Sequence, residues 1–77
     1  MELKQVLTDI ARAIVDNPDA VNVIEEVDGD DIELTLTVAE SDTGMVIGRH
    51  GRIAKAIRQV MKAAANTAGK RVTVEIR

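Results

Sequence analysis

The 77-residue chain lacks whole classes of side chain, and each absence excludes a kind of site. It has no cysteine, which excludes disulfide frameworks, thiolate metal sites and cysteine nucleophiles. It has no Phe, Trp or Tyr, which excludes proteins that bind nucleic-acid bases by stacking them on aromatic rings. One histidine, His50, and one serine, Ser41, leave little material for a catalytic triad. We therefore expect no enzyme activity, no catalytic residue, no cofactor and no metal.

Length and hydropathy predict one small domain. Domains commonly span about 50–250 residues, so residues 1–77 are expected to form a single one. No apolar run approaches the ~18 residues of a membrane span, and no signal-peptide pattern precedes the first helical pattern. We expect a soluble, cytoplasmic protein without a membrane partner.

Acidic residues are nearly missing from one half of the chain, although the net charge is −3. Residues 1–43 contain twelve acids and two bases, a net charge of −10. Residues 44–77 contain eight bases and one acid, a net charge of +7, and the two halves add to −3. A net negative charge argues against nucleic-acid binding, but this separation of charge along the chain predicts an anion-binding face opposite a face that repels anions. The alternative interpretation is a charge pattern that serves only solubility.

Hydrophobic periodicity predicts six elements in the order α-β-β-α-α-β. The first helical pattern ends before Pro18, because proline disfavours helical dihedrals in the residue that precedes it. Two strand patterns flank the turn-forming cluster Asp28–Asp31 and predict a hairpin. The expected bounds are helices at about 2–16, 43–47 and 52–68 and strands at 21–27, 32–38 and 71–77.

Capping residues set the ends of the two C-terminal helices. Ser41 and Asp42 are expected to cap the short helix, and Gly69 is expected to end the long one. The apolar face expected on the long helix comprises Ile53, Ile57, Val60 and Ala64, and the opposite, basic face comprises Arg52, Lys55, Arg58 and Lys62. That basic face has no Glu or Asp, although acids commonly alternate with bases for i,i+4 pairing.

The start of the long helix has cations where helices usually have acids. The helix dipole favours Asp and Glu there by about 0.3–1 kcal/mol each. The residues found instead are Arg49, His50, Arg52 and Lys55. Gly48 and Gly51 bracket the preceding turn and would let a ligand approach the backbone. Cations beside unpaired helix N–H groups predict a phosphate site, whereas the simpler alternative is a helix-turn-helix kink that only needs glycine.

Residues 42–53, with the sequence DTGMVIGRHGRI, resemble the G-x-x-G segment of a KH domain. The predicted element order is that of the type II KH fold, an α+β fold with a three-stranded sheet and helices packed on one face. A chain of this length resembles the KhpA family of small bacterial single-KH RNA-binding proteins. The resemblance covers residues 1–77 as one KH domain, and residues 42–53 are its most specific part.

The resemblance implies binding of about four nucleotides of single-stranded RNA, with the G-x-x-G loop clamping the phosphate backbone. The candidate RNA-binding residues are Gly48, Arg49, His50, Gly51, Arg52, Lys55, Arg58, Val46 and Ile47. The bases would lie in an apolar groove between the two C-terminal helices and the central strand, residues 32–38. The family also implies a homodimer, a KhpB-like multidomain KH partner, a function as RNA chaperone or post-transcriptional regulator, and a link to cell-wall elongation and cell shape.

Competing phosphate motifs fit poorly. Gly44, Gly48 and Gly51 do not give G-x-G-x-x-G, and G-x-x-x-x-G-K-[ST] is absent, which excludes the Rossmann and P-loop fingerprints. The second hypothesis is a KH-fold protein-interaction module with little RNA binding, whose alanine-rich long helix forms a dimer face. The residues fix neither the base preference nor the choice between RNA and single-stranded DNA.

Overall fold

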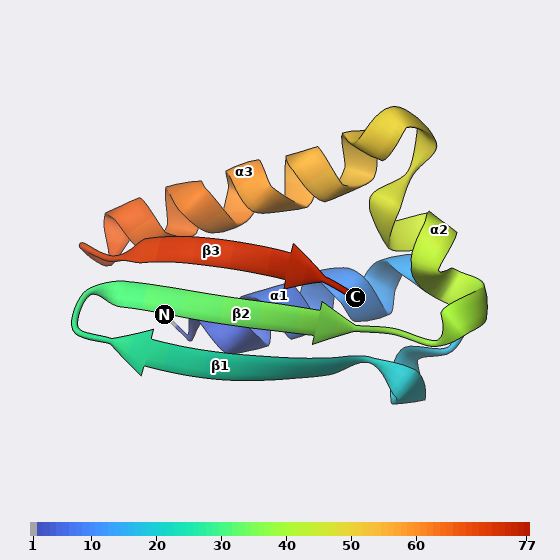
Figure 1. Ribbon diagram of the computed structural model, residues 1–77, viewed down its shortest axis with the longest axis horizontal. Helices are drawn as coiled ribbons and strands as arrows, with labels where there is room; N and C mark the ends of the chain where they lie inside the picture. The colour runs from blue at the N-terminus through green and yellow to red at the C-terminus, as the bar shows by residue number, and fades with distance from the viewer. Residues whose placement is uncertain (1) are drawn as a thin grey trace.

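The computed structural model describes residues 2–77 and has the predicted element order around one three-stranded sheet (Figure 1). The helices are α1 (Leu3–Ile14), α2 (Thr43–Ile47) and α3 (Arg52–Thr67), and the strands are β1 (Asn22–Asp28), β2 (Asp31–Thr37) and β3 (Arg71–Ile76). The single-turn helices η1 (Pro18–Ala20), η2 (Glu40–Asp42) and η3 (Arg49–Gly51) lie in the connections. Each predicted helix and strand is confirmed, with bounds that differ by at most two residues.

The sheet has the strand order β1-β2-β3 and mixes antiparallel with parallel pairing. β1 and β2 form the predicted hairpin, whose tight turn requires the positive φ of 62° at Gly29. β2 and β3 are parallel, so the chain must cross from one end of the sheet to the other between them. α2 and α3 make this crossover, which brings the segment between them to one end of the molecule (Figure 1).

The hydrophobic core lies between the sheet and one layer of helices. On β2, the side chains of Ile32, Leu34 and Leu36 alternate with exposed or half-buried residues and are buried under the helices. α1 lies behind the sheet in Figure 1 and buries the stripe Leu3, Leu7 and Ala11. The helices therefore cover one face of the sheet, as the sequence predicts, and leave the other face open.

The buried side of α3 differs from the expected one. Its buried residues are Ala54, Ile57, Met61 and Ala65, at the helical spacing that faces the sheet. Ile53 and Val60 belong to the expected apolar face, but they are 37% and 51% exposed. The apolar arc of this helix is wider than its contact with the sheet, so these two side chains lie on the flank beside α1.

Asp42 does not cap α2 through its side chain, so that part of the capping prediction is wrong. Asp42 is 1% exposed, and its carboxylate accepts hydrogen bonds from the backbone N–H of Asn17 at 2.9 Å and from the Asn17 Nδ2 at 3.1 Å. The bonds tie the connection after α1 to the start of α2. At the other helix, Gly69 has a φ of 72° just beyond α3, which confirms the predicted helix end.

The open face of the sheet is acidic. The strand register places five carboxylates on it, from Glu26, Asp28, Asp31, Glu33 and Glu75. Arg71 bonds Asp31 at 2.6 Å and Arg77 bonds Glu75 at 2.8 Å, and the Asp31 carboxylate raises the pKa of Arg71 through that hydrogen bond. Both ion pairs are exposed and contribute little to stability, but they leave this face with more acids than bases.

Candidate nucleic-acid interface

Gly48 ends α2 in a backbone conformation that residues with a Cβ atom do not readily adopt. Its φ of 76° and ψ of 175° fall in a region that essentially only glycine adopts. A Cβ at this position would also lie 2.6 Å from the Cγ1 of Ile53. Its N–H donates to the Gly44 carbonyl at 2.8 Å and closes the helix. Both the dihedrals and the contact with Ile53 therefore require glycine here.

The second glycine of the loop has a different structural reason. Gly51 has a φ of 72° and a ψ of 14°, the left-handed helical region, and a Cβ there would meet nothing within 4 Å. His50 has the same kind of backbone, with φ 58° and ψ 25°. The turn is closed by a hydrogen bond from the Gly51 N–H to the Gly48 carbonyl at 3.2 Å. Open space around Gly51 leaves its backbone accessible to a ligand.

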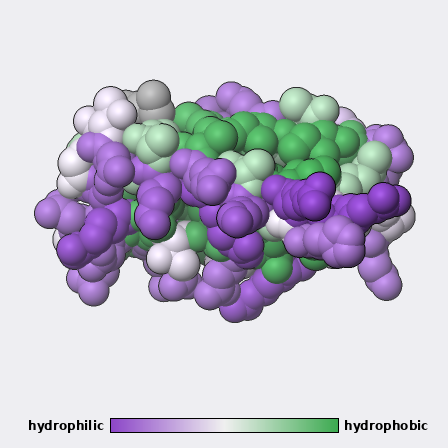
Figure 2. All heavy atoms as spheres, turned by 90° about the horizontal axis from the view of Figure 1, so that it is seen from above, coloured by the Kyte–Doolittle hydropathy of each residue, from purple (hydrophilic) through white to green (hydrophobic). Residues whose placement is uncertain are grey.

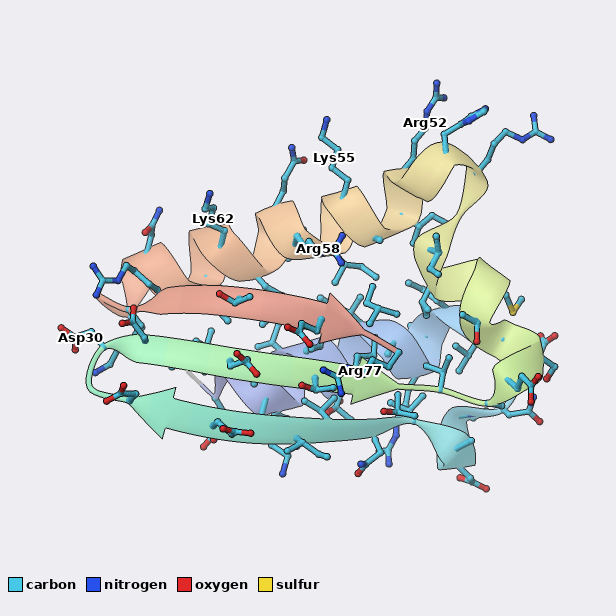
Figure 3. The ribbon with its side chains drawn as sticks, in the orientation of Figure 1. Asp30, Arg52, Lys55, Arg58, Lys62 and Arg77 are labelled. Carbon is cyan, nitrogen blue, oxygen red and sulfur yellow. The ribbon has the colours of Figure 1, made fainter. Side chains whose placement is uncertain are left out.

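The cations predicted around the helix start gather at this loop. Arg49, His50, Arg52 and Lys55 are all exposed. Arg52 and Lys55 extend from α3 away from the sheet (Figure 3). Within residues 2–77, none of the four forms an ion pair or donates a side-chain hydrogen bond. The charge of Arg49, Arg52 and Lys55 is therefore not neutralised by the described part of the chain and remains available to an anion.

A groove of about 330 Å³ continues from these cations along α3. Its lining comprises Lys55, Arg58, Gln59 and Lys62 from α3 and Val72, Thr73 and Val74 from β3. Lys55 belongs both to the loop cations and to the groove, so the two features are continuous. We call this the α3–β3 groove. It combines an apolar floor from β3 with a cationic wall from α3.

Two of the candidate residues on α2 differ sharply in exposure. Val46 is fully buried in the core, so its side chain cannot touch a ligand in this structure. Ile47 is 38% exposed next to the loop. The apolar side chains of residues 32–38 are all in the core, so they do not line an open groove in this structure. The accessible groove lies along β3, where a wall of helix and an edge strand meet.

The sequence prediction of individual contacts missed five residues of the α3–β3 groove, which are Gln59, Lys62, Val72, Thr73 and Val74. Gln59 and Lys62 follow Lys55 and Arg58 at helical spacing, so the same periodicity could have included them. Thr73 carries no such signal, because its place depends on which strand borders α3. Arg52 differs in position from the other cations of the basic face, because it borders a second groove on the opposite flank of α3.

This second groove, the α1–α3 groove, has a volume of about 450 Å³ and is almost wholly apolar. It is lined by Ile10 and Ile14 from α1 and by Arg52, Ile53, Ala56, Ile57 and Val60 from α3. Seen from above, an apolar stretch runs along the molecule between hydrophilic side chains (Figure 2). Ile53 and Val60 are thus exposed in a continuous apolar surface rather than singly.

No helix within residues 2–77 is long and apolar enough to cross a membrane. In that same range, no three His, Asp or Glu side chains are grouped so that they could hold a metal ion.

The family model for the KH domain of KhpA and KhpB matches residues 4–76. The chain belongs to this family. Among its KhpA relatives, the protein named RNA-binding protein KhpA from Clostridium acetobutylicum is 55% identical over 74 residues, which cover 96% of this chain and 99% of the relative. The KhpA of Bacillus subtilis is 45% identical, covering 96% and 91%. The family predicted from residues 42–53 is therefore confirmed.

Solved structures confirm the type II KH fold. Era in complex with MgGDPNP and nucleotides 1506–1542 of 16S ribosomal RNA matches with a TM-score of 0.71 at 19% identity. Era of Aquifex aeolicus bound to GDP and aluminium fluoride matches with a TM-score of 0.68, also at 19% identity. Each match covers 96% of this KhpA-family chain but only 28–29% of the Era chain. At this identity the likeness concerns the fold alone.

Proposed function

We propose that this protein binds single-stranded RNA with the loop Gly48–Gly51 and the adjoining α3–β3 groove. The observation that carries the proposal is the continuity of the two features through Lys55. Cations without an ionic partner in the described chain lead from the loop directly into a groove with an apolar floor. A phosphate backbone needs the first feature and unstacked bases need the second. The name RNA-binding protein, which the KhpA relatives share, supports the same function.

In this proposal the loop and the groove act on different parts of the strand. Arg49, His50 and Arg52 attract a phosphate, and the open space at Gly51 lets it approach the loop backbone. The following bases lie against the half-buried Val72 of β3. From residue 52 to residue 62, α3 rises by about 15 Å, which suits the roughly four nucleotides that KH domains bind.

Replacing the loop cations tests the proposal. We expect Arg49→Asp/His50→Asp to lower the affinity for an oligo(U) 8-mer at least tenfold in fluorescence anisotropy, because the loop then repels phosphate. The matched control is Lys4→Asp/Arg12→Asp on α1, which makes at least as large a charge change at exposed positions away from the loop. Equal binding by intact protein and loop variant would overturn the proposal, and so would an equal loss in both double variants.

We also propose that a second copy of the chain covers the α1–α3 groove and forms a homodimer. Ile53 and Val60 expose apolar area in a groove that has almost no polar lining. In light scattering at high micromolar concentration we expect a dimer for the intact chain and a monomer for Val60→Asp. Gln59→Asp adds the same charge on the neighbouring residue, which lines the opposite groove, and should leave the dimer intact. A monomeric intact chain would contradict this proposal.

Membership of the family supports a more specific cellular function. We propose that the protein is a cytoplasmic RNA chaperone or post-transcriptional regulator that acts with a KhpB-like multidomain KH protein in cell-wall elongation and cell shape. Purification of the tagged chain from its own cells, with identification of bound protein and RNA, tests both partners. Absence of a KhpB-like protein from the bound fraction would contradict the partnership.

The alternative function is a KH-fold interaction module that binds protein and little RNA. The apolar α1–α3 groove is the observation that favours it. Salt separates the two functions, because binding through phosphates weakens steeply as salt increases whereas an apolar interface is nearly insensitive. A protein that dimerises but shows no RNA binding at low salt would support the alternative.

A further inference from the structure

Arg58 differs from the other cations of α3 because its side chain crosses the α3–β3 groove. Its Nε donates a hydrogen bond to the Val74 carbonyl at 3.1 Å. In Figure 3 it lies on the side of α3 that faces β3, whereas Lys55 and Lys62 extend away from the sheet. A charge that only attracted phosphate from solvent would gain nothing from this contact. The bond instead holds the guanidinium against the floor of the groove.

The strand geometry explains why the Val74 carbonyl is available. β3 is an edge strand, and the backbone N–H groups of Arg71 and Arg77 donate to Asp30 and Leu36 on the β2 side. In a parallel pair, successive residues of a strand point their backbone N–H and C=O groups alternately toward and away from the neighbouring strand. Residues 71, 73, 75 and 77 therefore face β2, and the backbone groups of Val74 point away from it. Arg58 satisfies the outward carbonyl and is held in one place by it.

This fixed contact leaves the two terminal amino groups of Arg58 as a paired donor. Among the described residues, only the Nε of this guanidinium donates a hydrogen bond to the protein, and Arg58 forms no ion pair. A guanidinium is planar and always charged, and its donors are arranged as a rigid fork. Such a fork fits a partner with two adjacent acceptors.

The floor beside this fork favours a base over a phosphate as the partner. Val72 and Val74 line the groove next to Arg58; the side chain of Val72 is half-buried and offers apolar contact to a ring, whereas Val74 is 6% exposed. Guanine presents adjacent acceptors at O6 and N7, and cytosine presents them at O2 and N3. Adenine has an amino donor beside N1 and N7, and uracil has an N–H between its two carbonyls. Adenine and uracil therefore cannot occupy the fork with two acceptors.

We infer that Arg58 is a specificity-determining residue, which selects guanine or cytosine over adenine and uracil at one position of the bound strand. The inference rests on the proposed RNA binding in the α3–β3 groove. It adds to that function a base preference that neither the loop nor the lysines could supply, since those groups contact every nucleotide alike.

The test uses U-only 8-mers that carry a single G, C or A at one central position. We expect the intact chain to bind the G or the C oligonucleotide about 5- to 10-fold more tightly than the A and U ones, near the low end of a bidentate base contact. Arg58→Lys keeps the charge and removes the fork, so it should abolish the preference and change oligo(U) affinity less than threefold. Circular dichroism checks that this variant is folded.

Two controls identify the contact. Lys62→Ala lies in the same groove and should weaken all four oligonucleotides alike, without changing their order. If G is preferred, 7-deazaguanosine, which lacks the N7 acceptor, should bind like A. If C is preferred, O2 and N3 of cytosine are the two acceptors that the guanidinium of Arg58 binds.

The possible failures are distinguishable. No binding of any oligonucleotide would contradict the proposed function itself. Binding of all four with equal affinity would overturn the inference about Arg58 and leave the proposed function standing. A base preference that survives in Arg58→Lys would also overturn the inference about Arg58. An equal loss of affinity for all four oligonucleotides in that variant would overturn it as well, because such a loss indicates a phosphate contact.

Discussion

At the residue scale, the two loop glycines show how one motif contains two different requirements. Gly48 is fixed by its dihedrals and by Ile53, whereas Gly51 needs only a left-handed backbone. The sequence predicts both positions from the G-x-x-G spacing but cannot distinguish them. The distinction depends on the contact between residues 48 and 53, which exists only once α3 has folded back beside α2.

Alanine substitutions should therefore have unequal effects on stability. Gly48→Ala combines a forbidden backbone region with a clash, and we expect it to lower the free energy of unfolding by about 3 kcal/mol. Gly51→Ala places alanine in the left-handed region with open space around it, and we expect a loss of about 1 kcal/mol. Urea unfolding measures both. Equal losses would show that the contact with Ile53 has no energetic weight.

Asp42 is a residue whose function the sequence misassigned. Its position before α2 predicts a helix cap, but the carboxylate bonds Asn17 instead, 25 positions away along the chain. No local rule reveals such a partner. Pattern reasoning recovers contacts within an element or motif, and it fails where two connections meet in space.

Asp42→Ala should lower the free energy of unfolding by about 2–4 kcal/mol, because two donors lose a buried charged acceptor. Asn17→Ala removes only the Nδ2 bond and should cost about half as much. Asp16→Ala, at a neighbouring exposed position, should change stability by less than about 0.5 kcal/mol. Thermal and urea unfolding give the comparison. A loss for Asp16→Ala as large as that for Asp42→Ala would contradict this account of the buried carboxylate.

At the element scale, hydrophobic periodicity predicts the helices and strands well but not which flank of a helix is covered. The alternation in β2 gives one buried face, and the structure confirms it. On α3 the apolar arc exceeds the width of the contact, so Ile53 and Val60 remain exposed. The place of the groove at β3 depends on which edge of the sheet borders α3, and one strand's pattern does not contain that information.

The register of the hairpin places Glu26 directly opposite Glu33 on the open face. Like charges opposite one another destabilise a sheet, so Glu33→Gln should raise the free energy of unfolding by about 0.2–1 kcal/mol. The gain should shrink in 1 M salt, where the Debye length is about 3 Å. Glu40→Gln, in η2, is the control and should show no comparable gain. A destabilised Glu33→Gln variant would contradict the repulsion.

At the scale of the whole molecule, the charge separation in the sequence becomes a separation of surfaces. Five carboxylates, from Glu26, Asp28, Asp31, Glu33 and Glu75, lie on the open face of the sheet, whereas the loop and the α3–β3 groove bear the cations. The net charge of −3 conceals this arrangement. An acidic face repels a phosphate backbone, so we expect RNA to bind only on the cationic side.

The salt dependence of RNA affinity tests the central claim most directly. Binding through about three to five phosphates predicts a slope of log affinity against log salt of about −2 to −3.5 for an oligo(U) 8-mer. Removing one phosphate contact with Arg49→Gln should make that slope shallower by about 0.7. Lys4→Gln, on α1, should leave it unchanged. A slope near zero for the intact chain, or the same slope in the Arg49→Gln variant, would contradict the claim that this loop clamps the RNA backbone.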